Sequence, residues 1–162
     1  MDRRTMIKRV AGAAGILLWS GFARAAPTAE RIDKIGKSAV EWKKLLSPQQ
    51  FEILRAEGTE APFTSPLNHE TRSGLFVCVG CDLALFPSKF KFDSGTGWPS
   101  FYDVLSGHVE RKTDFKLGVP RTEYHCARCG GHHGHVFDDG PAPTGLRYCN
   151  NGVVLRFVAD KA

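Results

Sequence analysis

After its first 25 residues the chain lacks internal repeats, low-complexity tracts and any hydrophobic run near the roughly 20 residues that cross a bilayer. The missing repeats argue against a repeat architecture. The missing apolar run predicts that no stable membrane span remains once an N-terminal signal is removed. The length fits one domain. A domain of this size has a core of its own, and a metal ion would add to its stability.

The same region also lacks an excess of charge of one sign. The whole chain has 22 basic and 17 acidic side chains, but residues 1–25 contain five of the basic ones and only one acidic one. Residues 26–162 therefore hold 17 basic and 16 acidic side chains, a formal net charge of +1. The basic isoelectric point belongs to the N-terminal segment. No basic face is left to argue for nucleic acid as a partner.

The N-terminal segment has the order of a secretory signal. Charged residues come first, an apolar stretch follows from about Val10 to Phe22, and Ala23-Arg24-Ala25 forms an A-x-A site. The pair Arg3-Arg4, followed by Thr5 and two apolar residues, resembles a twin-arginine export signal. We therefore expect a signal peptide at 1–25 and a periplasmic protein. An ordinary Sec signal or an uncleaved anchor is the alternative.

Helix punctuation lies early in the remaining chain. Ser47 is placed as an N-cap, Pro48 at the first helical position, Gln50 completes a capping box, and Gly58 is the stop signal. The apolar residues just before Ser47 suggest a shorter helical turn. From Gly74 onward, short apolar runs between Gly, Pro and Asp predict a mostly antiparallel β body, with strands at 74–78, 107–112, 122–126, 135–137 and 153–158. We expect a flexible lead-in at 26–39 and the domain at 40–160.

Four of the five cysteines form two C-x-x-C pairs, Cys78 with Cys81 and Cys126 with Cys129. One turn of this spacing can present two sulfurs to one ion, and four thiolates are a ligand set of structural zinc, at about 2.3 Å each. The pairs are separated by 44 residues, more than the roughly 15–20 of the usual zinc ribbon. We therefore expect one structural zinc ion that joins two distant hairpins.

Two disulfides are the alternative for these pairs, because exported domains often contain disulfides. A disulfide within one C-x-x-C closes a very small, strained ring, however, and is usually redox-active. Export in the folded state would also let zinc load in the reducing cytoplasm, which favours zinc. His69, His108 or His125 could replace a ligand, although four cysteines complete the set without them.

Cys149 is the cysteine that the two pairs leave over. A free cysteine usually behaves as a small buried hydrophobe, but its neighbours here are polar. With the period of two of a strand, Arg147, Cys149 and Asn151 lie on one face. Arg147 can stabilise a thiolate, the reactive form of cysteine, and Asn151 can orient a polar group of a substrate. This pattern favours a nucleophile.

Two further motifs contain candidate partners for Cys149. In "GGHHGHVFDDGP", His132 and His135 are three residues apart, and a histidine near Cys149 could donate a proton in catalysis. Surface histidines and metal ligands are the alternatives. In "SGTGWPSF", Trp98 lies in a loop rich in Gly and Pro. Such a tryptophan is often a core residue, but it can also form the wall of a small apolar pocket.

The motifs "SGTGWPSF", "HxGHVFDDGP" and "RYCNN", placed around the two C-x-x-C pairs, closely resemble those of methionine-R-sulfoxide reductases, the B type. The similarity runs from about Val40 to Val158. It implies two antiparallel sheets in a zinc-stapled β body with a short helical N-terminal lead. It also implies thiol-dependent reduction of oxidised methionine, free or in proteins, with a thioredoxin-like protein or a small thiol as the external reductant.

The resemblance also implies a role for each residue that matches a family motif. Cys149 would attack the sulfoxide sulfur and keep the oxygen as a sulfenic acid, a reversible oxidation state of cysteine. His132 and His135 would hydrogen-bond and protonate the sulfoxide oxygen. Asn151 would help to orient water or substrate.

Other matched residues would support this reaction. Trp98 would contact the methyl group on the sulfoxide sulfur, and Arg147 would favour the thiolate, with Asp139 as its partner. The zinc ligands would be Cys78, Cys81, Cys126 and Cys129. The sequence departs from many members of the family at Thr96, where they have a cysteine that resolves the sulfenic acid as a disulfide. Regeneration of Cys149 is therefore the step that the departure puts in question.

Two other classes of function compete with this one. A zinc-stapled β module that binds a ligand without turnover would need the C-x-x-C pairs but has no use for Cys149, His132, His135 and Asn151 together. A thiol-disulfide oxidoreductase that uses a C-x-x-C would require a thioredoxin-like βαβ pattern, which the sequence does not contain.

Overall fold

The computed structural model describes residues 31–161. The expected signal peptide and residues 26–30 of the lead-in lie outside this range. Two short helices come first, α1 (Ala39–Leu45) and α2 (Pro48–Ala56). Ser47 caps α2 in a capping box with Gln50, as predicted. The helix ends at Ala56, and the left-handed residue that caps it is Glu57, with φ 55°, rather than Gly58. No helix within residues 31–161 is long and apolar enough to cross a membrane.

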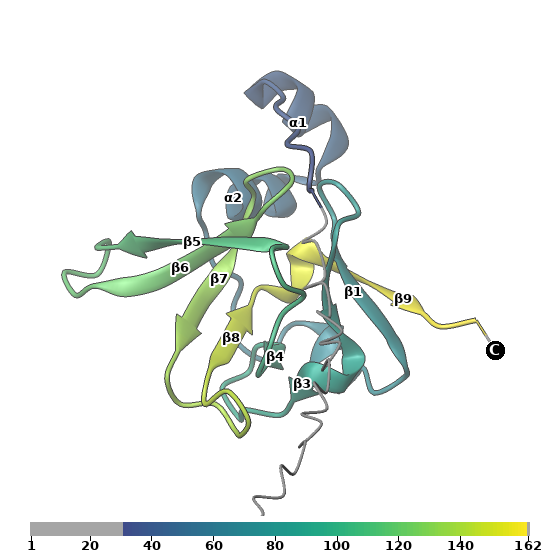
Figure 1. Ribbon diagram of the computed structural model, residues 1–162. Helices are drawn as coiled ribbons and strands as arrows, with labels where there is room; N and C mark the ends of the chain where they lie inside the picture. Colours follow the sequence, from purple (N-terminus) through teal and green to yellow (C-terminus); the bar gives the residue numbers. More distant parts are fainter. Residues whose placement is uncertain (1–30, 162) are drawn as a thin grey trace, which may run out of the picture.

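Two antiparallel sheets form the body of the molecule (Figure 1). The smaller sheet has the order β2 (Ala84–Pro87), β1 (Gly74–Cys78) and β9 (Leu155–Ala159). The larger has the order β3 (Lys91–Phe92), β4 (Ser100–Phe101), β8 (Arg147–Asn150), β7 (His132–Phe137), β6 (Arg121–Cys126) and β5 (Val109–Asp114). Three 3₁₀ turns connect elements: η1 (Pro66–His69), η2 (Ser88–Phe90) and η3 (Gly152–Val154). The predicted mainly β class with a helical lead is confirmed.

Several strand boundaries differ from those expected. Strand β7 begins at His132 rather than His135, and β9 begins at Leu155 because residues 152–154 form a 3₁₀ turn. Strands β2, β3 and β4 were not predicted as strands. They have four, two and two residues, too few for an alternating pattern to stand out from the loops around them.

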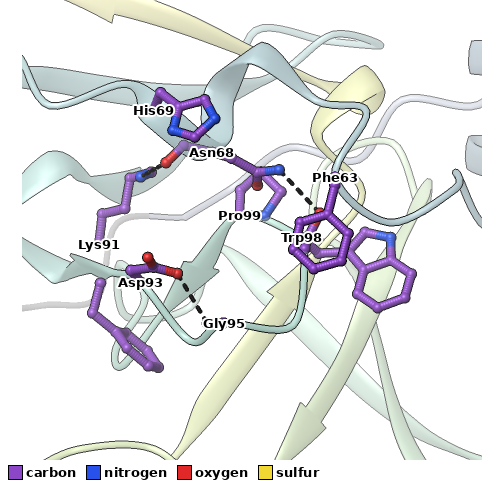
Figure 2. A pocket seen from close by; sticks show the side chains of 10 residues that line it. Phe63, Asn68, His69, Lys91, Asp93, Gly95, Trp98 and Pro99 are labelled. Carbon is purple, nitrogen blue, oxygen red and sulfur yellow. Dashed lines mark hydrogen bonds between the residues drawn. The ribbon is translucent and has the colours of Figure 1, made fainter.

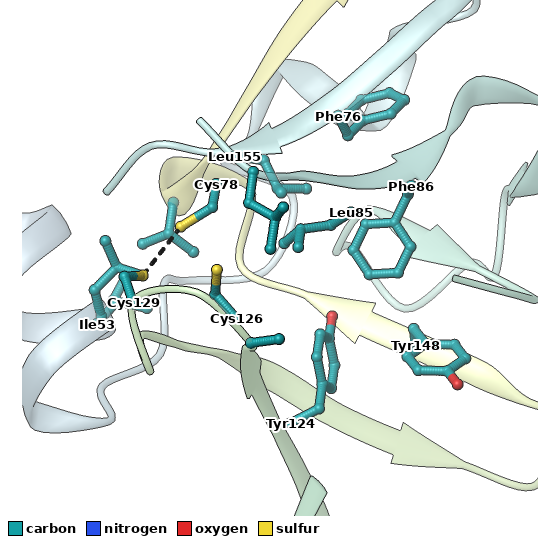
Figure 3. Packing of buried hydrophobic residues seen from close by; sticks show 14 of the residues in the cluster. Ile53, Phe76, Cys78, Leu85, Phe86, Tyr124, Cys126, Cys129, Tyr148 and Leu155 are labelled. Carbon is teal, nitrogen blue, oxygen red and sulfur yellow. Dashed lines mark hydrogen bonds between the residues drawn. The ribbon is translucent and has the colours of Figure 1, made fainter. Parts of the chain in front are cut away.

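The core lies between the two sheets and contains a group of aromatic side chains in mutual contact (Figure 3). Phe76 and Phe86 come from the smaller sheet, and Phe101, Tyr124 and Tyr148 come from the larger one; all are almost fully buried. Phe86 and Phe101 stack with ring centroids 4.2 Å apart. Aromatic pairs of this kind contribute beyond the burial of their area. This packing fixes how the two sheets face each other, and with it the positions of the cysteines at their ends.

Candidate active site and cysteine cluster

The two C-x-x-C pairs meet where the two sheets come together. Cys78 ends β1 and Cys81 follows in the turn, while Cys126 ends β6 and Cys129 lies in the turn before β7. The sulfurs of Cys78 and Cys129 are 3.6 Å apart and those of Cys81 and Cys126 are 3.4 Å apart. All four lie within 4.8 Å of one another. The cluster therefore bridges the smaller and the larger sheet (Figure 3).

The cluster has the chemistry and size of a zinc site. A tetrahedron with bonds of about 2.3 Å has sulfurs about 3.8 Å apart, close to the observed separations. None of the five cysteines forms a disulfide in the structure. The ligand set of the cluster is four cysteines alone. His108 is occupied elsewhere, where its Nδ1 contacts the carbonyl of Ala84 at 2.6 Å. Arg55 of α2 donates to the carbonyl oxygen of Cys129 at 2.9 Å and so ties the helical lead to the cluster.

Cys149 lies on β8 in the middle of the larger sheet. It is directly opposite His135 of β7 on one side and Ser100 of β4 on the other. Residues that are opposite in an antiparallel pair have their side chains on the same face of the sheet. Gly134 permits this approach, because a Cβ atom at that position would overlap the carbonyl oxygen of Cys149. The tertiary structure therefore pairs the lone cysteine with one of the two predicted histidines.

A cavity of about 140 Å³ opens at Cys149. It is lined by Thr59, Trp98, Arg121, Gly134, His135, Phe137, Cys149, Asn150 and Asn151. The structure thus brings four of the predicted residues to one pocket, which we term the Cys149 pocket. Arg147 and His132 are not among its lining residues.

Trp98 also borders a second cavity of about 150 Å³ on its other side, between the 3₁₀ turn η1 and the loop that leads to Trp98 (Figure 2). In this region Asn68 donates from Nδ2 to the carbonyl of Gly97 at 3.0 Å, and Lys91 donates to the carbonyl of Asn68 at 2.8 Å. These bonds hold the loop that places Trp98 against the Cys149 pocket.

The surroundings of Cys149 act on its thiol in opposite directions. Burial raises its pKa above the ordinary value, because a thiolate is poorly solvated there, whereas the Arg147 cation and a hydrogen bond from Thr96 lower it. Arg147 is itself held by a bidentate pair with Asp139, at 2.7 and 2.8 Å. The predicted partnership of Arg147 and Asp139 is therefore present, and Thr96 stands beside the sulfur.

The two histidines have different surroundings. His135 contacts Asp114 through Nε2 at 2.9 Å, and the pKa of that carboxyl is well below its usual range because of bonds from the Lys116 backbone, His135 and Arg121. His132 is almost fully buried, and its Nδ1 lies 2.5 Å from Glu123. Burial lowers the pKa of His132 to about 4. His135 lines both the Cys149 pocket and a neighbouring cavity, whereas His132 lines only the neighbouring cavity.

Asn151 is tied to the backbone on both sides. Its Oδ1 accepts from the N–H of Glu60 at 2.9 Å, and its Nδ2 donates to the carbonyl of His133 at 2.9 Å. It follows β8 rather than belonging to it, as the cap of η3. The side chain lines the Cys149 pocket, but its bonds are those of a residue that holds the pocket in shape.

Glu60 is a residue that the sequence patterns did not reveal. Its carbonyl accepts the indole N–H of Trp98 at 3.1 Å, and its buried carboxylate accepts the backbone N–H groups of Gly152 and Val153 at 2.5 and 2.9 Å. Together with the bond to Asn151, these contacts join three parts of the pocket through one residue. No motif marks Glu60 in the sequence, since its partners are 38 to 93 positions away.

Comparison with known proteins shows the family to which the chain belongs. The SelR domain family matches residues 46–159. A protein named peptide methionine sulfoxide reductase MsrB from Methanosarcina barkeri is 51% identical over 128 residues, which are 78% of this chain and 90% of that protein. One of the same name from Agrobacterium fabrum is 53% identical over 125 residues, 76% of this chain and 93% of that protein. The structure of the Mis18 'Yippee-like' domain, at 16% identity and a TM-score of 0.46 over 56% of this chain, is too distant to argue from. The match over most of the chain means that this protein belongs to the SelR domain family.

Proposed function

We propose that the protein reduces methionine sulfoxide to methionine, acting on the R epimer, with Cys149 as the nucleophile. One observation carries the proposal: Cys149 lies opposite His135 in a small pocket walled by Trp98. A thiol, an imidazole and an aromatic wall are what attack on sulfur, protonation of oxygen and binding of a methyl group require. No observation on residues 31–161 favours a module that binds without turnover.

The reaction balances with the groups that the pocket contains. The Cys149 thiolate attacks the sulfoxide sulfur and forms an S–S bond as a proton is added to the oxygen. The oxygen then bonds to Sγ of Cys149, and the bonds from the methionine sulfur to Sγ and to the oxygen break. Methionine leaves, and Cys149 is oxidised to a sulfenic acid. Because burial raises the pKa of Cys149, the positive charge of Arg147 and the hydrogen bond from Thr96 assist formation of the thiolate.

We assign the proton transfer to His135. Its ring lines the pocket, and Asp114 orients it through Nε2. When both nitrogens are protonated, the ring can donate Nε2–H to Asp114 and Nδ1–H to the sulfoxide oxygen. His132, with a pKa lowered to about 4, is neutral at pH 7 and packs beside His135 with ring centroids 5.5 Å apart. Its role would be to support the position of His135.

Regeneration of Cys149 would depend on an external thiol. The other four cysteines form the cluster between the sheets, and Thr96 cannot form a disulfide. One thiol would condense with the sulfenic acid and release water, and a second would free Cys149 from the mixed disulfide. The reductant would be a thioredoxin-like protein or a small thiol, and the substrate oxidised methionine, free or in proteins.

We further propose that the four-cysteine cluster holds one structural zinc ion. The four sulfurs leave no open coordination position, so the ion would join the two sheets rather than take part in the reaction. The metal would supply folding free energy, because its site does not exist in the unfolded chain.

The location of the protein is also a proposal. It rests on the sequence of residues 1–25, which has a twin-arginine pattern, an apolar stretch and an A-x-A site. The mature protein would begin at Ala26 and be periplasmic. Changing Arg3 and Arg4 to lysine keeps the charge but removes the guanidinium groups. Export of the full-length precursor should then fail, and undiminished export would indicate the Sec route.

The experiment that tests the activity supplies the two sulfoxide epimers separately, with a chemical thiol as reductant. The R epimer should be reduced and the S epimer should not. The Cys149→Ser variant should be inactive while its zinc content and melting temperature match those of the parent protein. Preference for the S epimer, or equal activity of the serine variant, would refute the proposed function.

A further inference from the structure

A second group of metal-ligating side chains lies on the larger sheet, apart from the cysteines. Glu123 and His125 are two residues apart on β6, so their side chains emerge on one face. The register of the sheet places His132 of β7 directly opposite His125. Strand period and cross-strand pairing thus bring a carboxylate and two imidazoles together.

These three side chains are in contact. Oε1 of Glu123 lies 2.5 Å from Nδ1 of His132 and 2.7 Å from Nε2 of His125. Each residue offers one ligand atom, and these three atoms lie within 4.8 Å of one another. The side chains of Glu123 and His132 are each 2% exposed, and that of His125 is 14% exposed. Polar side chains that are buried this deeply usually have a hydrogen-bond partner.

A route from solvent reaches the group. Glu123 and His132 line a cavity of about 350 Å³, whose outer wall includes Glu57, Lys116 and Leu117. The cavity also borders His135, which lines the Cys149 pocket as well. An ion that entered there would lie beside the proposed reaction site without passing through it.

We infer that Glu123, His125 and His132 bind a divalent transition-metal ion of the zinc class, and that the bound ion inhibits the reductase. The second half of this inference rests on the proposed function. Two imidazoles and one carboxylate are a known zinc ligand set that leaves a position open for water. Such a site exchanges its ion with solvent, unlike the closed four-cysteine cluster.

Nδ1 of His132 is hydrogen-bonded to Glu123, and its second buried nitrogen, Nε2, has no partner among the described residues. Binding of a metal through Nδ1 would require the proton to be on Nε2, and the metal bond would then replace the hydrogen bond to Glu123. The other carboxylate oxygen, Oε2 of Glu123, lies 3.3 Å from Lys112 and could keep that contact.

Charged side chains of both signs surround the group. Lys112 lies 2.5 Å from Glu57 as well as beside Glu123. Glu110 of β5, which lies directly opposite His125, pairs with Lys34 at 2.7 Å. Glu57 also lies 2.7 Å from Lys116, so its charge is shared between two lysines and offsets the repulsion of Lys112 on a cation only in part. Bound metal would fix the ring of His132, which packs on His135, and so restrain the histidine to which we assign the proton transfer.

The binding test uses the zinc-loaded mature chain with Cys149→Ser, which removes the thiol as a competing ligand. Zn²⁺ is titrated and the metal content is measured after removal of free ion. We expect two zinc ions per chain, and one when His125→Gln is added. The matched control is His69→Gln, which changes an exposed histidine outside the group and should leave two. If His125→Gln fails to fold, His125→Lys serves instead, since its ammonium group can pair with Glu123 and it lacks the imidazole.

The inhibition test uses chains with Cys149 intact and measures methionine formed in one turnover without reductant, because thiol reductants bind zinc. Zn²⁺ should inhibit the parent and the His69→Gln variant. The His125→Gln variant should need at least about 10–100-fold more zinc, because even changes outside the first ligands cost that much in affinity. One zinc ion per chain in the Cys149→Ser protein would overturn the site.

Equal zinc sensitivity of the parent and the His125→Gln variant would overturn the inhibition and would point to binding at Cys149. These failures differ from failure of the proposed function. A chain that binds two zinc ions but reduces neither sulfoxide epimer would retain the site and lose the reductase. An active chain that binds one zinc ion would retain the reductase and lose the site.

Discussion

Replacing Glu60 by glutamine should damage both stability and turnover, although Glu60 contacts neither Cys149 nor the proposed acid. Its carboxylate is 5% exposed and accepts two backbone N–H groups, those of Gly152 and Val153. Glutamine has nearly the same shape but only one oxygen. One N–H would therefore keep an acceptor, and the other would face the new amide donor.

The magnitude follows from these two bonds. A buried donor left without a partner costs about 1–3 kcal/mol, and replacing a charged acceptor by a neutral one costs about 1 kcal/mol more. We expect the free energy of unfolding of Glu60→Gln to fall by about 2–4 kcal/mol, with a loss in melting temperature on the order of 10 °C. Glu110→Gln is the control, because its side chain is 53% exposed and surface changes stay within about 0.5 kcal/mol.

The effect on turnover follows from the backbone of Glu60, which bonds Asn151 and Trp98. Loosening of this segment should shift both walls of the Cys149 pocket, and a misplacement of about 1 Å can cost up to about 100-fold in rate. The assays are denaturant unfolding and single-turnover reduction of the R epimer, with zinc content measured alongside. If Glu60→Gln unfolds like the Glu110→Gln control and keeps the parent rate, the role assigned to Glu60 is wrong.

Four further predictions use single variants. Arg147→Gln should raise the pKa of Cys149 further, because the Arg147 cation would no longer oppose the effect of burial. The single-turnover rate, which needs the thiolate, should then rise at a higher pH than in the parent. An unshifted pH profile would count against this role of Arg147. Cys81→Ser should lose metal and unfold, because structural zinc contributes folding free energy; metal analysis with a melting curve decides it, and a stable, metal-free wild type would disprove it. His135→Gln should lower the single-turnover rate by about 10²–10⁴-fold, and a near-normal rate would place the acid elsewhere. After one turnover Cys149 of the parent should rest as a sulfenic acid, whereas Thr96→Cys should give an internal disulfide, because Thr96 is near enough to Cys149 to lower the pKa of its thiol; peptide mass analysis with a sulfenic-acid trap distinguishes the two.

The local elements could be predicted because their causes are local. Ser47, Pro48 and Gln50 satisfy one another within three positions, and the capping box formed as expected. The C-x-x-C spacing places two sulfurs on one turn, whatever the rest of the chain does. The helix stops just before Gly58 as expected, but Glu57, which is not glycine, is the residue that adopts the left-handed conformation. Very short strands such as β3 exist only through their pairing with β4.

The sequence by itself determined the fold class, the two cysteine pairs and Cys149 as the cysteine left over. Only the tertiary structure decided which distant residues meet. The register of β7 against β8 sets His135, rather than His132, opposite Cys149. The joining of the sheets brings the sulfurs of Cys78 and Cys129 to 3.6 Å. Glu60 gained its place through bonds to residues up to 93 positions away. Contacts across such separations depend on how whole sheets pack, and no local pattern encodes that packing.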